Sequence, residues 1–144
     1  MEYNYYGKDT KNIKPIVDDL NINNQHELYQ KLLTIWSKET CAPRMRDRWS
    51  MDNKTLGQCT ITAFLVQDIF GGDVYGIPLG DGNFHCFNIV NDIIFDLASE
   101  QFLPKILDYN NRFLQDRNVH FKKEEKRKRY EFLKNELYRK YGKK

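Results

Sequence analysis

A chain of 144 residues, of which 40% are hydrophobic and 14% aromatic, is long enough to bury its own core, and this composition excludes a disordered protein. The 30% of charged residues predicts a well-solvated surface around one domain over residues 1–144. Three cysteines without a CxxC pair argue against a disulfide framework or a zinc finger. No segment has transmembrane length and the N-terminus lacks the apolar stretch of a signal peptide, so we expect a cytoplasmic protein with no membrane contact.

The beginning of the chain predicts a loose arm followed by an amphipathic helix. Residues 1–12 are polar, rich in Tyr and Asn, and without a sustained period, which indicates an arm outside the core. Asn24 is a candidate helix N-cap, with Glu27 as its reciprocal partner three residues later. The helix that follows places four apolar side chains on one face: Leu28, Leu32, Ile35 and Trp36.

A long loop and a buried helix come next. Residues 37–57 show no periodicity, and loops of this length in compact domains commonly carry function. Residues 59–70 are apolar on nearly every side, which predicts a central, buried helix that begins at Cys59. Gly71 and Gly72 supply the left-handed conformation at the C-terminal end of this helix.

Three strands are predicted at residues 73–79, 84–90 and 93–97, and together with the helices they indicate an α+β core over residues 24–102. Pro78 marks the first strand as an edge strand, or ends it. If residues 91 and 92 form a two-residue hairpin turn, His85 and Asp96 lie diagonally across one face of the sheet. A three-residue turn would move Asp96 to the opposite face.

Cys59, His85 and Asp96 are the candidate catalytic residues. A cysteine at a helix N-terminus beside an imidazolium is stabilised as a thiolate, and a carboxylate can orient the imidazole. His85 would activate the thiol and return a proton to the leaving group, while Asp96 would fix the tautomer. The Cys59 N–H and the Gln58 side chain are candidates for the oxyanion hole. This chemistry predicts neither a cofactor nor a metal.

Each of these residues also has a structural interpretation. Cys59 could be a small apolar filler, His85 a satisfied core histidine, and Asp96 a cap at a strand end. A metal site would use Cys41, Cys59, His85 and Cys86. We disfavour it because adjacent residues of a strand point to opposite faces.

Two tryptophans near the cysteine are candidates for the substrate pocket. Trp49 lies in the 37–57 loop and Trp36 directly before it, so both could wall a compact aromatic pocket. Such a pocket fits a small amide or a single protein side chain. Trp36 also fits a plain core position, and we expect that role for it.

The C-terminal part, residues 104–144, is predicted to be helical. A short helix is expected within residues 104–116, and residues 122–144 hold eleven Lys/Arg and four Glu in a second helix. This basic amphipathic helix carries an apolar stripe that predicts docking on the domain: Tyr130, Leu133, Leu137 and Tyr141. Because no base-stacking motif accompanies the charge, a solvated helix face is favoured over a nucleic-acid surface.

Four segments resemble the YunG-like family of small, largely uncharacterised bacterial proteins. They are residues 36–38, the Gly57-Gln58-Cys59 helix through residue 72, residues 85–88, and residues 96–102. The resemblance implies a papain-like or transglutaminase-like α+β core with Cys59, His85 and Asp96 as the triad, and it implies no substrate. Cys86 stands where the family pattern has an aromatic residue. The chain also lacks the papain-type glutamine several residues before the nucleophile.

These observations lead to a thiol enzyme of acyl transfer, acting by amide hydrolysis, deamidation or transamidation through a thioester on Cys59. The alternative is a non-catalytic binding or regulatory protein on a papain-like scaffold, since a fold does not determine a function. An accessible thiol of low pKa separates the two hypotheses. Nucleic-acid binding through residues 122–144 is a third, weaker hypothesis, and it predicts strong salt dependence.

Overall fold

The computed structural model describes residues 4–144 of the chain. Its α-helices are α1 Gln25–Leu32, α2 Cys59–Phe70, α3 Arg117–His120 and α4 Glu124–Tyr141. Its strands are β1 Asp73–Pro78, β2 Phe84–Val90, β3 Ile93–Phe95 and β4 Phe113–Leu114. Short 3-10 helices occur at η1 Pro43–Arg48 and η2 Ser99–Phe102. The fold is α+β, as predicted.

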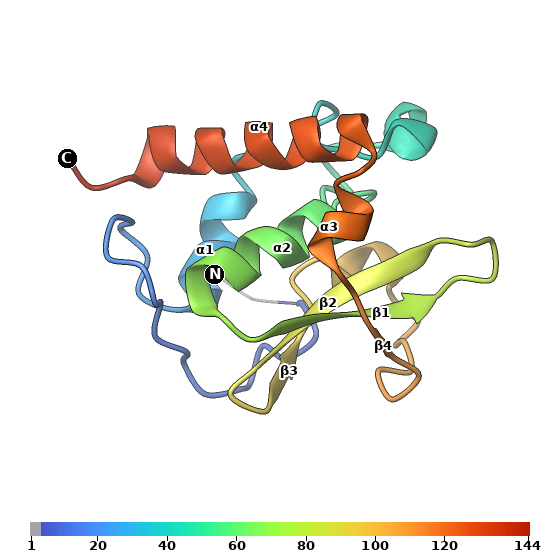
Figure 1. Cartoon of the computed structure of the whole chain (residues 1–144), viewed down its shortest axis with the longest axis horizontal. Coiled ribbons are helices and arrows are strands. Elements are labelled where there is room, and N and C mark those ends of the chain that lie inside the picture. Colours follow the sequence, from blue (N-terminus) through green and yellow to red (C-terminus); the bar gives the residue numbers. More distant parts are fainter. Residues whose placement is uncertain (1–3) are drawn as a thin grey trace.

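Helix α2 is the centre of the molecule, as its sequence predicted. It lies between the sheet and α4, so that three layers stack in the order sheet, α2, α4 (Figure 1). Ile61, Phe64 and Leu65 are fully buried. Asn88 on β2 donates a hydrogen bond of 2.8 Å to the Ala63 carbonyl, which fixes the helix on the sheet. The chain then leaves α2 through two glycines with positive φ, at positions 71 and 72.

The antiparallel sheet has the strand order β3-β2-β1-β4. Asn91 and Asp92 form a two-residue turn with φ of 52° and 65°, as in a type I′ hairpin. Asn88 therefore pairs with Phe95 and Val90 with Ile93, which confirms the predicted register. Pro78 ends β1, but β1 is not an edge strand because β4 pairs with its other side.

The prediction of a helix within residues 104–116 is wrong. This segment is turn and extended chain that runs beneath the sheet and ends in β4. It buries Leu107 and Tyr109 against Ile77 and Phe87, on the sheet face away from α2. Burying alternate residues requires an extended chain, and the apolar contact with the sheet outweighs the local preference for helix.

The prediction of a loose arm over residues 1–12 is also wrong for residues 4–12. Residues 1–3 lie outside the part of the chain that the structure describes. Tyr5 is only 1% exposed and belongs to the main core. Tyr6 pairs with Asp96 at the outer side of β3, where its carbonyl accepts the Asp96 N–H at 2.9 Å. Apolar and backbone contacts with distant parts of the chain order this polar segment.

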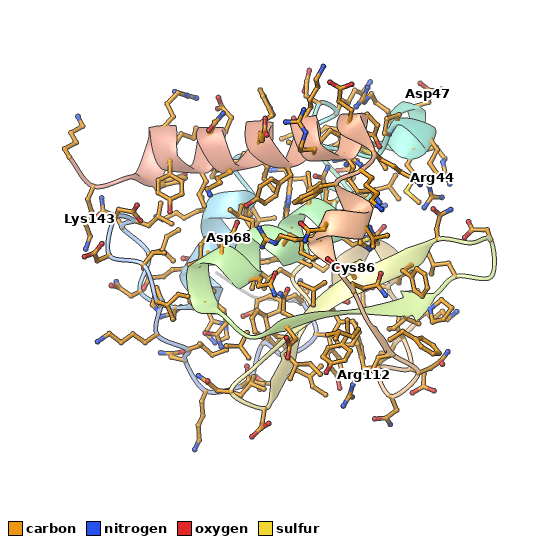
Figure 2. All side chains as sticks on the ribbon, in the orientation of Figure 1. Arg44, Asp47, Asp68, Cys86, Arg112 and Lys143 are labelled. Carbon is orange, nitrogen blue, oxygen red and sulfur yellow. The ribbon has the colours of Figure 1, made fainter. Side chains whose placement is uncertain are left out.

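The cap of α1 and the packing of α4 agree with the predictions from the sequence. Asn24 caps α1 by accepting the Glu27 N–H at 2.9 Å. Tyr130, Leu133 and Leu137 of α4 are buried, so the apolar stripe docks on the domain. Asp68 of α2, labelled in Figure 2, joins the layers by accepting from Arg117 at 2.7 Å and from the Tyr130 hydroxyl. Within residues 4–144, no helix is both long and apolar enough to cross a membrane.

Candidate active site

Cys59 is the first residue of α2 and lies beside an unpaired stretch of β2. Strand β3 ends at Phe95, so within residues 4–144 no strand pairs with β2 on that side near Phe84 and Cys86. Alternate residues of an antiparallel strand direct their N–H and C=O groups to the same neighbour. The Phe84 carbonyl and the Cys86 N–H therefore face the sulfur instead of a strand. Cys59 Sγ lies 3.9 Å from Phe84 O, and the Cys86 N–H acts on it as a hydrogen-bond donor.

His85 and Asp96 form a buried pair, as the hairpin register predicted. His85 Nε2 and Asp96 Oδ2 are 2.6 Å apart, and both side chains are 1% exposed. The second ring nitrogen, Nδ1, is buried and has no hydrogen-bond partner within residues 4–144. Because the carboxylate engages Nε2, Nδ1 is the ring nitrogen left for a further partner.

Two further groups hold the Asp96 carboxylate, and sequence reasoning missed the more important one. Tyr109 donates its hydroxyl to Asp96 Oδ2 at 2.7 Å, and the Ala98 N–H donates to Oδ1 at 3.2 Å. Tyr109 comes from the segment that was predicted to be helical, and nothing in its local sequence signals this contact. With His85, these donors satisfy a carboxylate that would otherwise be costly to bury.

The electrostatics of the site favour a thiolate beside an imidazolium. Burial opposes ionisation of Cys59, but the positive charge of the neighbouring His85, with the Cys86 N–H and Thr60, lowers its pKa to about 7. Burial likewise opposes protonation of His85, but the charges of Asp96 and Cys59 raise its pKa to about 10. Between these two values the site holds Cys59 as a thiolate and His85 as an imidazolium. The sulfur also lies within hydrogen-bonding distance of Thr60 Oγ1, at 3.7 Å.

The other two cysteines have raised thiol pKa values, in contrast to Cys59. Cys41 and Cys86 are both buried, and burial raises the pKa of each thiol. Cys86 also lies near the negative charge of Cys59, which raises its pKa further. Cys59 is thus distinguished from both by exposure and by pKa.

The structure does not bring the Gln58 side chain to the site. Gln58 is fully buried, and its amide donates to Ser37 O at 3.1 Å. A different glutamine, Gln101, lines the cavity next to Cys59, where it accepts the Gly57 N–H at 3.3 Å and donates to Ala98 O at 2.9 Å. The first N–H groups of a helix have no intrahelical acceptor, so the Cys59 N–H remains a candidate oxyanion donor.

A cavity of about 560 Å³ contains Cys59 and His85. It is bounded by η1, the β1–β2 hairpin, α3 and the start of α4, which gather at one end of the molecule (Figure 1). Its apolar lining includes Met45, Leu79, Phe84, Phe102 and Val119.

Neither tryptophan lines this cavity, so the predicted aromatic pocket is wrong. Trp36 is 3% exposed and donates to Thr62 Oγ1 at 3.0 Å, in the core position also expected for it. Trp49 is turned toward its own loop and donates to Lys54 O at 2.9 Å. The loop instead contributes η1 to the cavity, because Pro43 and its neighbours fold back over the N-terminus of α2. Among the residues described, no group of three or more His, Cys, Asp or Glu side chains could hold a metal ion.

Comparison with known proteins gives a family match over most of the chain. The protein family described as YunG protein matches residues 24–142. The chain is similar to a protein of Bacillus subtilis (strain 168) named "Uncharacterized protein YunG", with 32% identity over 69 residues. This similarity covers 48% of the chain and 59% of the relative, which is less than two thirds of that protein's length. No solved structure matches the chain. On the family match, the chain belongs to the family described as YunG protein.

Proposed function

We propose that this protein is a thiol enzyme of acyl transfer that works through a thioester on Cys59, on a papain-like or transglutaminase-like core. One observation carries the proposal: the Cys59 thiol, its pKa lowered to about 7, lies in a cavity beside a buried His85–Asp96 pair at 2.6 Å. Perturbed pKa values at a cavity wall are typical of catalytic groups. A histidine with a purely structural role in the core has its ring nitrogens hydrogen-bonded, whereas His85 Nδ1 is buried without a partner within residues 4–144.

The first half-reaction would form the thioester. The Cys59 thiolate attacks the carbonyl carbon of an amide, and the oxygen becomes an oxyanion near the N-terminus of α2. His85 then gives its Nδ1 proton to the amine nitrogen as the C–N bond breaks. The products are the acyl thioester on Cys59, a free amine and a neutral His85, which Asp96 keeps in the Nε2–H tautomer.

The second half-reaction would release the acyl group. Neutral His85 takes a proton at Nδ1 from water or from an amine, which attacks the thioester carbonyl. The C–S bond breaks, and the thiolate and imidazolium are restored. Water yields hydrolysis or deamidation, and an amine yields transamidation.

The dimensions of the cavity favour a compact substrate. About 560 Å³ lies within the range of small-molecule sites, and the apolar side chains that line it suit an acyl stem. We therefore propose a small amide or one amide-bearing protein side chain as the acyl donor. The three reactions share the thioester. Hydrolysis and deamidation both use water as the acceptor and differ in the amine released, whereas transamidation uses an amine as the acceptor.

The test is the pH profile of Cys59 alkylation by iodoacetamide, followed by mass spectrometry of the labelled peptide. The wild-type rate should rise with a midpoint near pH 7, and His85→Ala should move that midpoint to about 8.5 or higher. Cys41 and Cys86 act as internal controls, because burial raises the pKa of both. If Cys59 reacts no faster than they do and the variant changes nothing, the enzyme is rejected in favour of a binding or regulatory protein.

A further inference from the structure

The wall of the cavity opposite the sheet is strongly cationic. The start of α4 and the helix η1 bring four cationic side chains to it: Arg44, Lys123, Lys126 and Arg129. Glu125 is the carboxylate that lines the same wall. It accepts from Arg129 at 2.7 Å, so the charges of Glu125 and Arg129 form an ion pair. Arg129 also donates to Thr40 O at 3.0 Å. Arg44, labelled in Figure 2, forms a long ion pair of 3.9 Å with Asp81.

Lys126 is held in place by a neutral histidine. Its Nζ lies 3.0 Å from His120 Nδ1, while His120 Nε2 lies 2.7 Å from Gln115 Oε1. The amide oxygen can only accept, so Nε2 carries the proton and Nδ1 accepts from the ammonium. Burial, and then the charges of Lys126 and Lys123, lower the His120 pKa to about 4. His120 therefore positions Lys126 without adding or neutralising charge.

Lys126 has no carboxylate partner within residues 4–144, although it is only partly exposed. Burial and the neighbouring Lys123 lower its pKa, against the opposing effect of negative charge at Cys86 and Cys59. Lys126 and Cys59 line the same cavity, so the ammonium group and the sulfur face one bound molecule. A partly desolvated cation that is fixed in a ligand cavity and lacks a counter-charge is stabilised when an anion binds there.

We infer that the substrate carries an anionic oxygen group, a carboxylate or a phosphate, which binds Lys126 while the acyl stem packs against Phe84, Phe102 and Val119. This inference rests on the proposed function, because it assigns the substrate class to that site. Lys123 and Arg44 add long-range attraction at the cavity rim. Lys126 is accordingly the residue that determines specificity, and a neutral amide of the same shape is a poorer substrate.

Reactive probes that differ only in charge test this inference on the whole chain. N-iodoacetyl-β-alanine and its primary amide both transfer an acylmethyl group to Cys59, with an S–C bond formed and iodide released. The ratio of their rates cancels any change in thiolate fraction. For the wild type we expect the acid to react about two- to fivefold faster, the gain from one partly exposed ion pair. N-iodoacetyl-2-aminoethylphosphonate, as a third probe, shows whether a carboxylate or a phosphate-type group is preferred.

Variants on α4 provide the controls. Lys126→Gln should bring the acid-to-amide ratio most of the way down to that of a small free thiol, with Lys123 and Arg44 accounting for the remainder, and Lys126→Arg should retain most of the preference. Lys128→Gln, on the exposed side of the same helix, should leave the ratio unchanged because Lys128 pairs with Glu124. A wild-type ratio equal to that of a free thiol, or one insensitive to Lys126→Gln, overturns the inference. Slow reaction of both probes would instead indicate failure of the proposed function.

Discussion

Asp96→Asn removes the charge that keeps His85 protonated and leaves the size of the side chain unchanged. Asp96 raises the His85 pKa against the opposing effect of burial, and His85 in turn lowers the Cys59 pKa. Without the carboxylate, the buried imidazole should become neutral at pH 7. The Cys59 pKa should then rise from about 7 to the ordinary thiol value of about 8.5 or above.

The expected magnitude follows from the thiolate fraction. A pKa of about 7 leaves half of Cys59 ionised at pH 7, whereas a pKa of about 8.5 leaves about 3%. A more basic thiolate is also intrinsically more nucleophilic, by about fivefold for this shift. Alkylation at pH 7 should therefore slow by about threefold, while the rate at high pH should rise about fivefold. The two profiles should cross.

The assay is iodoacetamide alkylation from pH 5 to about 10, with Cys59 located by mass spectrometry. Asp92→Asn is the matched control, since it makes the same chemical change in the exposed turn, where Asn readily adopts the observed φ of 65°. A thermal melt of each variant shows that the protein is folded. A wild-type midpoint near 8.5, or a midpoint near 7 that Asp96→Asn does not move, would refute the coupling between carboxylate, imidazole and thiol.

Two further substitutions separate stability from chemistry. Tyr109→Phe removes one donor from the buried Asp96 carboxylate, so urea denaturation should show a loss of about 1–3 kcal/mol while the alkylation midpoint stays near 7. A large midpoint shift at unchanged stability would contradict this purely positioning role. Gly72→Ala should cost more than the ~1–2 kcal/mol of a left-handed residue, because its Cβ would overlap Ile89 O. Gly80→Ala has a similar φ of 86° but open space around it, and equal losses at both glycines would show that the overlap is relieved.

Local patterns predicted the parts of the site that depend on neighbouring residues. The apolar period identified α2 and placed Cys59 at its start. The length of the Asn91-Asp92 turn determined which face of the sheet Asp96 occupies. The alternation of side chains along β2 placed His85 on the same face. These features are set within one or two elements, where sequence spacing translates directly into geometry.

The walls of the cavity could not be predicted in the same way. Trp49 is close to Cys59 in sequence, yet its loop turns the indole away and presents η1 instead. Lys126 and Tyr109 reach the site from remote parts of the chain, through the packing of α4 and of the extended segment beneath the sheet. Their positions depend on tertiary contacts that leave no local pattern in the sequence.

The short length of β3 connects these findings. Because β3 stops at Phe95, the chain turns at Asp96 and leaves the edge of β2 free for Cys59. The N-terminal segment stabilises that turn. The Asp96 N–H donates to Tyr6 O at 2.9 Å, and the Tyr6 ring stacks on the Tyr109 ring with a distance of 4.0 Å between their centroids. The N-terminal segment that the sequence predicts to be a loose arm thus supports the Asp96 carboxylate and Tyr109. Because the chain turns into these contacts instead of continuing the β-ladder, the edge of β2 is left to the Cys59 sulfur, while Asp96 holds the His85 imidazole.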